Sequence, residues 1–465
     1  MSGGVALALL LAALAYFASG ARRLAYCGYY LAYVPFITID ASMGGLTDVT
    51  QLGGSNLLFK LSVRVAATAL VLWSAWRERE RVLRVLSSAA TVPLIVLVLW
   101  ALLGLYRTQV PWVPLFRLGE LCVFFVTGAT LFAVAAHDAP PRAILRWHCL
   151  ALAPLLAIAV WFAMNQPELA FHTSRDGIQR MGHKFMNANV LGFSAVVVLL
   201  WSAFELSQPR ERARAFLLER ALPWLTLSLA AYVLYHARSR TATVTAFVGF
   251  GVLFFPYWPS ERGRAARFAL GLAALALVAA LSVDSFEQYF LRGESAAEVA
   301  TGTGRTELWK DLLLQQVPRA PWLGAGYMML SSEGGFFHAG HFWNNAHNTY
   351  LFALVSLGVP GFLCVTTLAL MPLVVALRRL YRAPRAERGA WTLVVALLVV
   401  VVLTSIPEFG IVGYPNVTML FHYALYAFVM LRGGSAPREL QGERHVSRAP
   451  NERAPSSSTL SPEYS

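Results

Sequence analysis

The stretch TLVVALLVVVVL at residues 392–403 decides the fold class, because almost every position in it is apolar. A strand of a membrane β-barrel alternates apolar and polar residues, whereas a helix that crosses a bilayer is apolar on every face. Similar apolar stretches of about 17 to 25 residues recur along the chain, which is the length that a bilayer requires. The sequence therefore predicts an all-α fold, a polytopic integral membrane helical bundle.

The net charge of +13 would suggest a nucleic-acid partner in a soluble protein, but the basic residues concentrate in every second connection between apolar stretches. By the positive-inside rule these connections are cytoplasmic, and their arginines set the topology and contact anionic membrane lipids. The alternation predicts about 12 or 13 transmembrane helices with the C-terminus inside, and no nucleic-acid partner. The basic connections contain Arg22 and Arg23, residues 77–84, Arg142 and Arg146, residues 210–220, residues 262–267, residues 378–388 and the tail after Arg432.

The chain divides into four predicted parts. Residues 1–283 form the N-terminal transmembrane helices, residues 284–346 a long periplasmic loop with an amphipathic helix, and residues 347–431 the C-terminal transmembrane helices. Residues 432–465, rich in Ser, Pro, Arg and Glu, form a disordered cytoplasmic tail. The first apolar segment, GVALALLLAALAYFASG (4–20), has no basic residue ahead of it, so we interpret it as a retained span and not as a signal peptide.

The long loop contains the stretch TGRTELWKDLLLQQVPRAPWLGAGY (303–327), whose leucines recur at helical spacing. This pattern predicts an amphipathic helix that lies on the membrane or on the bundle. Arg305 falls in its first turn, where the helix dipole favours an anion and disfavours a cation. Either a bound anion offsets this conflict, or Arg305 is exposed and is balanced by Glu307 and Asp311.

Further cations lie toward the outer end of the bundle. Arg240, in a short connection, is held at the top of the bundle, where charge is unfavourable unless it is paired or used. The outer half therefore holds more positive charge than the topology needs, and this favours an anionic ligand such as a phosphate or pyrophosphate. The alternative for the cations within spans is snorkelling to the headgroups. The other outer cations are Lys60, Arg64, Arg117, Arg180 and Lys184.

The stretch NNAHNTYLFALVSLGVPG (344–361) places His347 at the outer end of a span. Gly358 and Gly361 follow on the same face of the expected helix, and Pro360 is expected to bend it. Such glycines allow another helix or an acyl chain to approach the backbone. A histidine here is suited to accept a proton from a hydroxyl group near neutral pH, although histidines at helix ends also serve as packing or capping residues.

Nothing in the sequence favours a metal or a cofactor. His338 and His341 could join His347 as metal ligands, but no cysteine or suitably spaced carboxylate completes the site. The sequence has no D-x-D pair and no phosphate-binding glycine loop, so a soluble nucleotide donor is not expected.

The pattern His347-Asn348, nine residues, Gly358, two residues, Gly361 resembles the H-[N/S/Q]-x9-G-x-x-G signature of the O-antigen ligases and Wzy-type polysaccharide polymerases. Three further pieces are similar to segments of that superfamily: SRTA (239–242), TGRTELW (303–309) and GHKFMNANVLG (182–192). Members commonly have proline between the two asparagines of the last piece, where this chain has Ala188.

The resemblance implies a metal-independent, inverting glycosyltransferase of the bacterial inner (cytoplasmic) membrane. Such an enzyme moves a glycan from undecaprenyl pyrophosphate to an acceptor sugar hydroxyl on the periplasmic side. His347 would then activate the acceptor hydroxyl, while Arg240 and Arg305 bind the pyrophosphate. The substrate-binding residues that we expect are Arg180, Asn189, Asn348, Lys60, Arg64, Arg117 and Trp309.

Three functional alternatives remain open, besides a purely structural membrane scaffold, which would leave the outer cations unexplained. A polymerase joins lipid-linked repeat units, and the stretch ITIDASMGGLTDVTQLGGSN (37–56) together with TGRTELW favours it. A ligase moves the finished chain to a lipid A-core acceptor. A transporter or flippase of lipid-linked glycans would place its charges near the midplane between repeated halves, which this sequence does not show. Other polysaccharide assembly proteins are possible partners of either enzyme.

Overall fold

The structure of the protein is a computed structural model. The residues described are 29–30, 32–33, 63, 65–73, 76, 79–108, 111–135, 140–173, 179–182, 186–208, 217–254, 305–328, 336–338, 341–343, 346–408, 410–413 and 416–431. Lys60, Arg64 and Lys184 lie outside these residues, as do the first apolar segment and the tail. The predictions made for them, and for the loop before Arg305, stay predictions.

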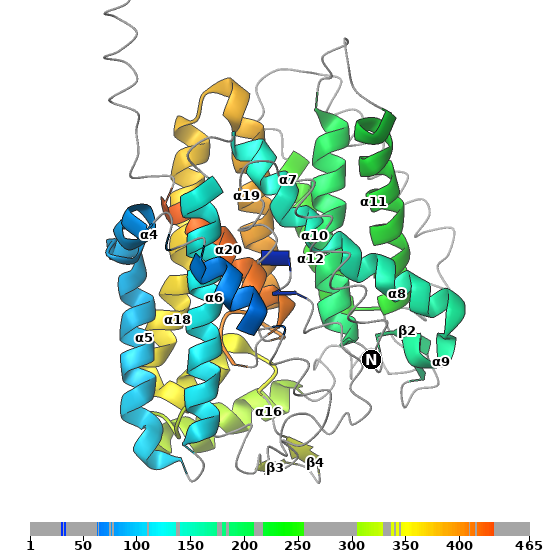
Figure 1. Cartoon of the computed structure of the whole chain (residues 1–465). Helices are drawn as coiled ribbons and strands as arrows, with labels where there is room; N and C mark the ends of the chain where they lie inside the picture. The colour runs from blue at the N-terminus through cyan, green and yellow to red at the C-terminus, as the bar shows by residue number, and fades with distance from the viewer. Residues whose placement is uncertain are drawn as a thin grey trace, which may run out of the picture.

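The described part of the chain is almost entirely helical, which confirms the predicted fold class (Figure 1). Its only strands form two short antiparallel hairpins, β1 (Phe171–Thr173) with β2 (Gln179–Met181) and β3 (Phe336–His338) with β4 (His341–Trp343). The helices are α4 (Arg79–Leu86), η4 (Ala89–Thr91), α5 (Val92–Leu103), η5 (Gly104–Arg107), α6 (Trp112–Ala135), α7 (Pro141–Leu150), α8 (Ala153–Asn165), α9 (Pro167–Ala170), α10 (Ala188–Ser207), α11 (Leu217–Ala237), α12 (Arg240–Phe254), α16 (Arg305–Asp311), η6 (Leu312–Gln316), η7 (Val317–Arg319), α18 (Thr349–Arg382), α19 (Arg385–Thr404) and α20 (Val417–Leu431).

Within the described residues, six helical segments are long and apolar enough to cross a membrane. They are Ala89–Arg107, Pro114–Phe132, Pro141–Asn165, Ala188–Ser207, Thr349–Arg382 and Arg385–Thr404, and Ala221–Ala237, Arg240–Phe254 and Val417–Met430 are shorter apolar helices. These segments support a multi-pass membrane protein. The predicted total of about 12 or 13 spans stays a prediction, because the remaining apolar stretches fall outside the described residues.

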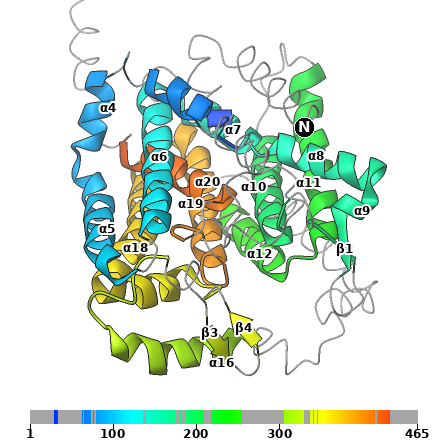
Figure 2. The same cartoon turned by 60° about the horizontal axis from the view of Figure 1, so that its bottom comes forward.

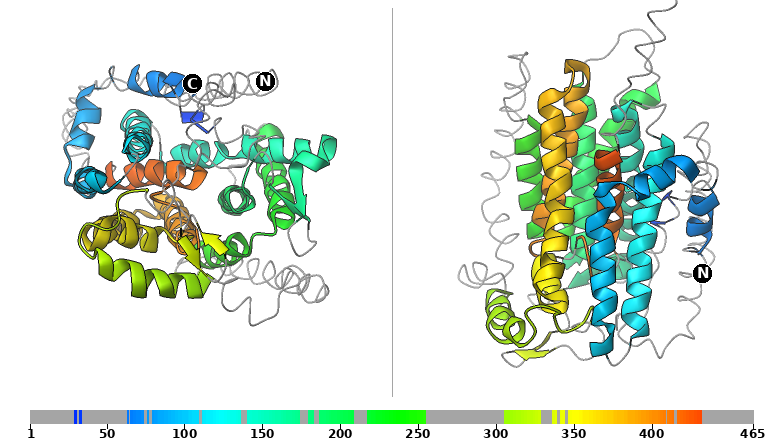
Figure 3. Two further views of the ribbon diagram at one scale, coloured as in Figure 1. Left: turned by 90° about the horizontal axis from the view of Figure 1, so that it is seen from below. Right: turned by 90° about the vertical axis from the view of Figure 1, so that its left-hand side faces the viewer.

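The bundle is organised around α20, which is buried along nearly its whole length. α20 packs on α6, α12 on α19, and α10 on α11, while α18 lies beside both α19 and α5 (Figures 1 and 3). Small residues allow α6 and α20 to cross closely: a Cβ added to Gly128 on α6 would lie 2.7 Å from the Cα of Ala424 on α20. Such close backbone contacts favour association of helices in lipid, where apolar burial contributes little.

The α18 helix is broken at Gly358, whose φ of 68° and ψ of −169° are not helical. We predicted a bend caused by Pro360, and the structure places the break two residues earlier. The prediction that a helix or an acyl chain would approach Gly358 is also wrong. A Cβ at this position would overlap the carbonyl oxygen of Trp322, so the neighbour is the backbone of the long loop.

α16, β3 and β4 lie at one end of the bundle, opposite the connection between α18 and α19 (Figures 1 and 2). We call this end the site end. The predicted amphipathic helix is present as α16, followed by a π-helical turn (η6) and a 3₁₀ turn (η7). Leu308 and Leu312 are fully buried against the bundle, whereas Leu313 and Leu314 are 47% and 65% exposed. The helix therefore lies on the bundle along one edge and presents its other edge outward.

Candidate functional site

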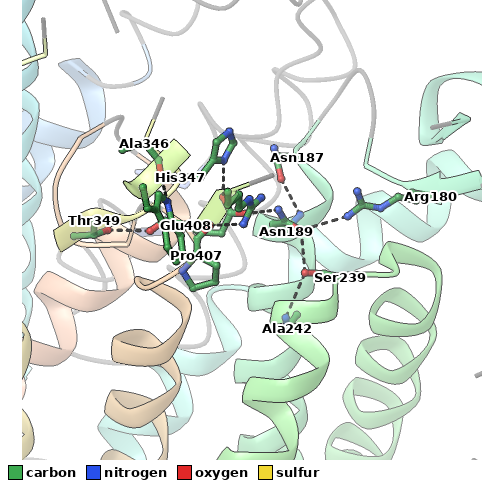
Figure 4. A network of polar contacts seen from close by, with 12 residues as sticks. Arg180, Asn187, Asn189, Ser239, Ala242, Ala346, His347, Thr349, Pro407 and Glu408 are labelled. Carbon is green, nitrogen blue, oxygen red and sulfur yellow. Dashed lines mark hydrogen bonds and ion pairs between the residues drawn. The ribbon is translucent and has the colours of Figure 1, made fainter. Parts of the chain in front are cut away.

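The site is centred on Glu408, a residue of the connection between α19 and α20 (Figure 4). Its Oε1 accepts hydrogen bonds from Asn189 Nδ2 at 2.6 Å and from Arg305 Nη2 at 3.2 Å. Its Oε2 lies 3.9 Å from His347 Nδ1. One carboxylate thus joins side chains from α10, from the long loop and from the start of α18. We call these four residues the Glu408 cluster.

Arg305 is the first residue of α16, and its guanidinium faces the connection that carries Glu408. In addition to its ion pair with Glu408, it donates from Nη1 to the carbonyl oxygen of Pro407 at 2.7 Å. The anion that the first turn of this helix favours is therefore supplied by the protein itself. Because an arginine carries more N–H groups than these two bonds use, it retains donors for a ligand, and 24% of its side chain is exposed.

Asn189 is held in place by its own helix. Asn187 accepts a hydrogen bond from the backbone N–H of Asn189 at 2.8 Å and so caps α10. The side-chain oxygen of Asn189 accepts from Ser239 Oγ at 3.0 Å and from Arg180 Nη2 at 3.3 Å. Arg180, on β2, also donates from Nε to Ala237 O at 3.3 Å. The predicted residues Arg180 and Asn189 therefore lie together next to Glu408.

Arg240 begins α12 directly after Ser239. Because Ser239 Oγ donates to Asn189, the start of α12 borders the Glu408 cluster. The preceding residue, Arg238, has a φ of 46°, so the connection between α11 and α12 turns sharply at this point. The sequence prediction that this short connection lies at the same end as His347 agrees with this arrangement.

His347 lies in a sharp turn, with a φ of 45°, and its neighbours are fixed on both sides. Trp309 Nε1 donates to the carbonyl oxygen of Ala346 at 2.8 Å, and Asn348 caps α18 by accepting from Leu351 N at 2.9 Å. Thr349 Oγ1 donates to Glu408 O at 3.0 Å. The imidazole is thereby held beside the carboxylate while 30% of it stays exposed.

The contacts of Glu408 determine its charge. Burial alone would raise the pKa of this carboxyl group, but His347 and Arg305 outweigh the burial and hold the pKa below its ordinary value of 4.5. Glu408 is therefore ionised at neutral pH. Of the cluster and the side chains bonded to it, Arg180 and Arg305 carry guanidinium groups and Glu408 carries the carboxylate.

Three of the predicted substrate-binding residues, Arg117, Trp309 and Asn348, form contacts within the protein itself. Arg117 is 5% exposed and forms an ion pair with Glu120 at 2.6 Å within α6. The indole N–H of Trp309 bonds to Ala346, and the side-chain oxygen of Asn348 serves as the helix cap. Contact of any of these with a substrate stays a prediction.

His338 and His341 are paired in the backbone register of the β3–β4 hairpin. Within the residues described here, no group of three or more His, Cys, Asp or Glu side chains lies close enough to hold a metal ion.

Sequence reasoning missed Glu408 and Ser239. Glu408 follows Pro407 in a short connection between two strongly apolar helices, on the side where few connections carry charge. A single carboxylate at such a place requires a cationic partner, and the excess of outer arginines provides it. This match of one carboxylate with an excess of arginines was the feature of the sequence that could have identified Glu408 as a site residue.

Residues 225–366 match the Wzy_C family model, which is described as O-antigen ligase. The matched segment contains Arg240, Arg305 and His347, and it ends just beyond the glycines of the predicted signature. Asn189 and Glu408 lie outside it. The predicted resemblance to the O-antigen ligase and Wzy-type superfamily is therefore confirmed over this part of the chain. No curated protein matches the chain.

Proposed function

We propose that this membrane protein transfers a glycan from undecaprenyl pyrophosphate to a sugar hydroxyl group on the periplasmic face of the bacterial inner membrane. The observation that carries the proposal is the Glu408 cluster, which joins a histidine and an arginine of the matched segment around one carboxylate. A base and an anion-binding group at one place are what this transfer needs.

In the proposed reaction, His347 takes the proton from the acceptor hydroxyl group. Because its Nδ1 faces Glu408, the proton goes to Nε2, and the carboxylate stabilises the imidazolium that forms. The acceptor oxygen attacks the anomeric carbon from the face opposite the pyrophosphate. The carbon–oxygen bond to the pyrophosphate then breaks, its electron pair stays on the leaving oxygen, and the configuration inverts.

The pyrophosphate gains negative charge as it leaves, and arginines at the site end stabilise it. Arg305 is the main candidate because it is preorganised by Glu408 and Pro407 and has N–H groups to spare. Arg240 and Arg180 border the same cluster and add positive charge. A preorganised donor of this kind contributes about 3 kcal/mol to the stabilisation of a transition state. The proposed chemistry therefore uses neither a metal nor a cofactor.

We propose a polysaccharide polymerase, with a second lipid-linked glycan as the acceptor. The second candidate is an O-antigen ligase with a lipid A-core acceptor, and the description of the matched family favours it. Both reactions use the same donor chemistry, so they differ in the acceptor alone. Other polysaccharide assembly proteins are expected partners in either case.

The test is to delete the gene in its host and to analyse surface polysaccharide and lipopolysaccharide on gels, with wild-type and His347→Ala copies as complements. Loss of secreted polysaccharide with an intact lipopolysaccharide ladder would support the polymerase. Loss of the ladder while long chains accumulate on the lipid carrier would support the ligase. If the His347→Ala copy complements as well as the wild type, the proposed chemistry is wrong.

A further inference from the structure

The break in α18 leaves backbone groups that no helical turn satisfies. In an unbroken helix Val355 O would accept from Val359 N, and Ser356 O would accept from residue 360, which is a proline without an N–H. In the structure, Val359 N instead donates to Pro321 O at 2.8 Å. Within a bilayer such freed groups must find partners inside the protein.

The partners come from residues 320–326 of the long loop, which we call the docked segment. Ala325 N donates to Val355 O at 2.8 Å, and Gly326 N donates to Ser356 O at 3.0 Å. Together with the bond from Val359, three backbone hydrogen bonds join the two chain segments. The loop thus replaces the missing part of the helical ladder.

Side chains from α5 and from η5, the turn that follows it, also bond to this junction, and α5 lies beside α18 (Figure 3). Trp100 Nε1 donates to Leu357 O, a third carbonyl at the break, at 2.9 Å. Arg107 Nη1 donates to Gly324 O in the docked segment at 2.7 Å. Both side chains thus donate hydrogen bonds to backbone carbonyl oxygens, one at the break in α18 and one in the docked segment.

Two glycines make this crossing possible. Gly358 has a φ of 68° and Gly324 a φ of 69°, a region that side chains other than glycine rarely adopt. A Cβ on Gly358 would overlap the carbonyl of Trp322, and a Cβ on Gly324 would overlap the backbone of Ser356. The two backbones therefore touch directly, and neither position tolerates a side chain without displacing the other segment.

The docked segment is continuous with the helix that carries Arg305. It follows η7 without a gap, and η7 follows α16 and η6. Leu308 and Leu312 are fully buried, and Trp309 bonds to the residue before His347. The helical unit from Arg305 to residue 319 is therefore fixed to the bundle at its middle and, through the docked segment, at its end.

From these contacts we infer that the break in α18 is the binding site of the docked segment. This contact positions Arg305 relative to His347. Gly358, Gly324 and Trp100 are positioning residues. The inference rests on the proposed function, because it explains how the proposed pyrophosphate-binding arginine reaches its place. It also assigns the first glycine of the signature a role in docking the loop and not in binding lipid.

Docking is tested by hydrogen–deuterium exchange on the full-length protein in lipid nanodiscs. Gly358→Ala should raise exchange in peptides covering residues 320–326 by about tenfold, because it removes the hydrogen-bonded crossing. Gly251→Ala is the matched control, since a Cβ on Gly251 meets nothing within 4 Å. Should Gly358→Ala fail to fold, Trp100→Phe removes the indole N–H that bonds to Leu357 O, together with part of the ring, and should raise exchange about threefold. Wild-type exchange in these variants would overturn the inference.

Positioning is tested by transfer kinetics. Gly358→Ala should lower kcat by about tenfold with KM for the lipid-linked donor changed less than about threefold. In an Arg305→Lys background, Gly358→Ala should lower kcat by less than about threefold. The placement of the guanidinium group that this glycine change disturbs is already lost in that background. An equal loss in both backgrounds would show that the glycine does not act through Arg305.

The outcomes separate this inference from the proposed function. A fully active His347→Ala variant would refute the proposed function whatever the exchange data show. An inactive His347→Ala variant combined with full activity of Gly358→Ala would refute the positioning role alone.

Discussion

The two histidines His347 and His148 lie in contrasting environments, and we propose that these environments give them different roles. His347 lies at the site end, 30% exposed, with a carboxylate oxygen 3.9 Å from its Nδ1. His148, on α7 away from the site end, is fully buried, stacks on Phe421 with ring centroids 4.1 Å apart, and shares a 2.6 Å hydrogen bond with Tyr29. We propose that access and a charged partner distinguish a reactive histidine, His347, from a packing one, His148. A histidine buried within the bundle, as His148 is, does not by itself indicate a functional site.

The largest expected effect is at His347. His347→Ala should lower transfer by about 10³-fold or more, because it removes the proposed base, and the carboxylate of Glu408, whose pKa is held below its ordinary value of 4.5, is a weaker base. The measurement is transfer of a labelled glycan by purified protein in nanodiscs. The thermal unfolding midpoint should stay close to the wild-type value, which would separate lost chemistry from lost folding. Wild-type transfer by this variant would remove the distinction between the two histidines.

Arg305→Lys should lower transfer by about 10²-fold, since a lysine keeps the charge but loses the planar fork that holds Glu408, Pro407 and a phosphate together. The same assay measures it. Arg319→Lys, at an exposed position of the same helical unit, is the matched control and should be unaffected. A fully active Arg305→Lys variant would show that Arg305 does not bind the leaving group.

Glu408→Gln should lower transfer by about tenfold, the equivalent of one charged hydrogen bond. The amide keeps the size of the side chain but cannot stabilise an imidazolium ion. The kinetic assay should show the loss in kcat. An unchanged kcat would mean that the carboxylate beside His347 is not what distinguishes it from His148.

The stability of the protein at low pH should depend on the carboxylate of Glu408. Because the folded protein holds the pKa of Glu408 below its ordinary value of 4.5, the ionised form stabilises the fold above that value. This contribution is lost as the pH falls through the lower, folded-state pKa. The difference in thermal midpoint between wild type and Glu408→Gln should therefore shrink on acidification, as scanning fluorimetry can measure. A difference that is constant with pH would contradict the assignment.

The smallest effect on transfer is expected at His148. His148→Phe should reduce the free energy of unfolding by about 1 kcal/mol through loss of the bond to Tyr29. Transfer per folded molecule should stay within about twofold of the wild type, because only packing is altered. Chemical denaturation and the transfer assay measure the two quantities. A tenfold loss of transfer would make His148 more than a packing residue.

Much of this arrangement could be predicted from residue patterns. Apolar stretches indicated the helices, and the spacing of His347 and Gly358 indicated the resemblance to the O-antigen ligase and Wzy-type superfamily. The placement of Arg305 in a first turn, where a cation is unfavourable, indicated that it has an anionic partner, although not that this partner is Glu408 of the protein itself. These features could be predicted because each depends on a short stretch of chain.

The parts that could not be predicted depend on contacts between distant segments. Glu408 belongs to the cluster only because α10, α18 and α16 meet at the same end of the bundle. The break at Gly358 could not be placed either, since Pro360 gives a stronger local signal and the partner of the glycine is a loop more than thirty residues away. No local pattern describes such a crossing.

The ion pair of Arg117 and Glu120 has a consequence for how the protein enters the membrane. The two charges lie one helical turn apart on α6, so they meet as soon as this helix forms. The pair carries no net charge, and its formation requires no other helix. We expect α6 to be inserted as an electrically neutral unit during synthesis, before the rest of the bundle assembles around it.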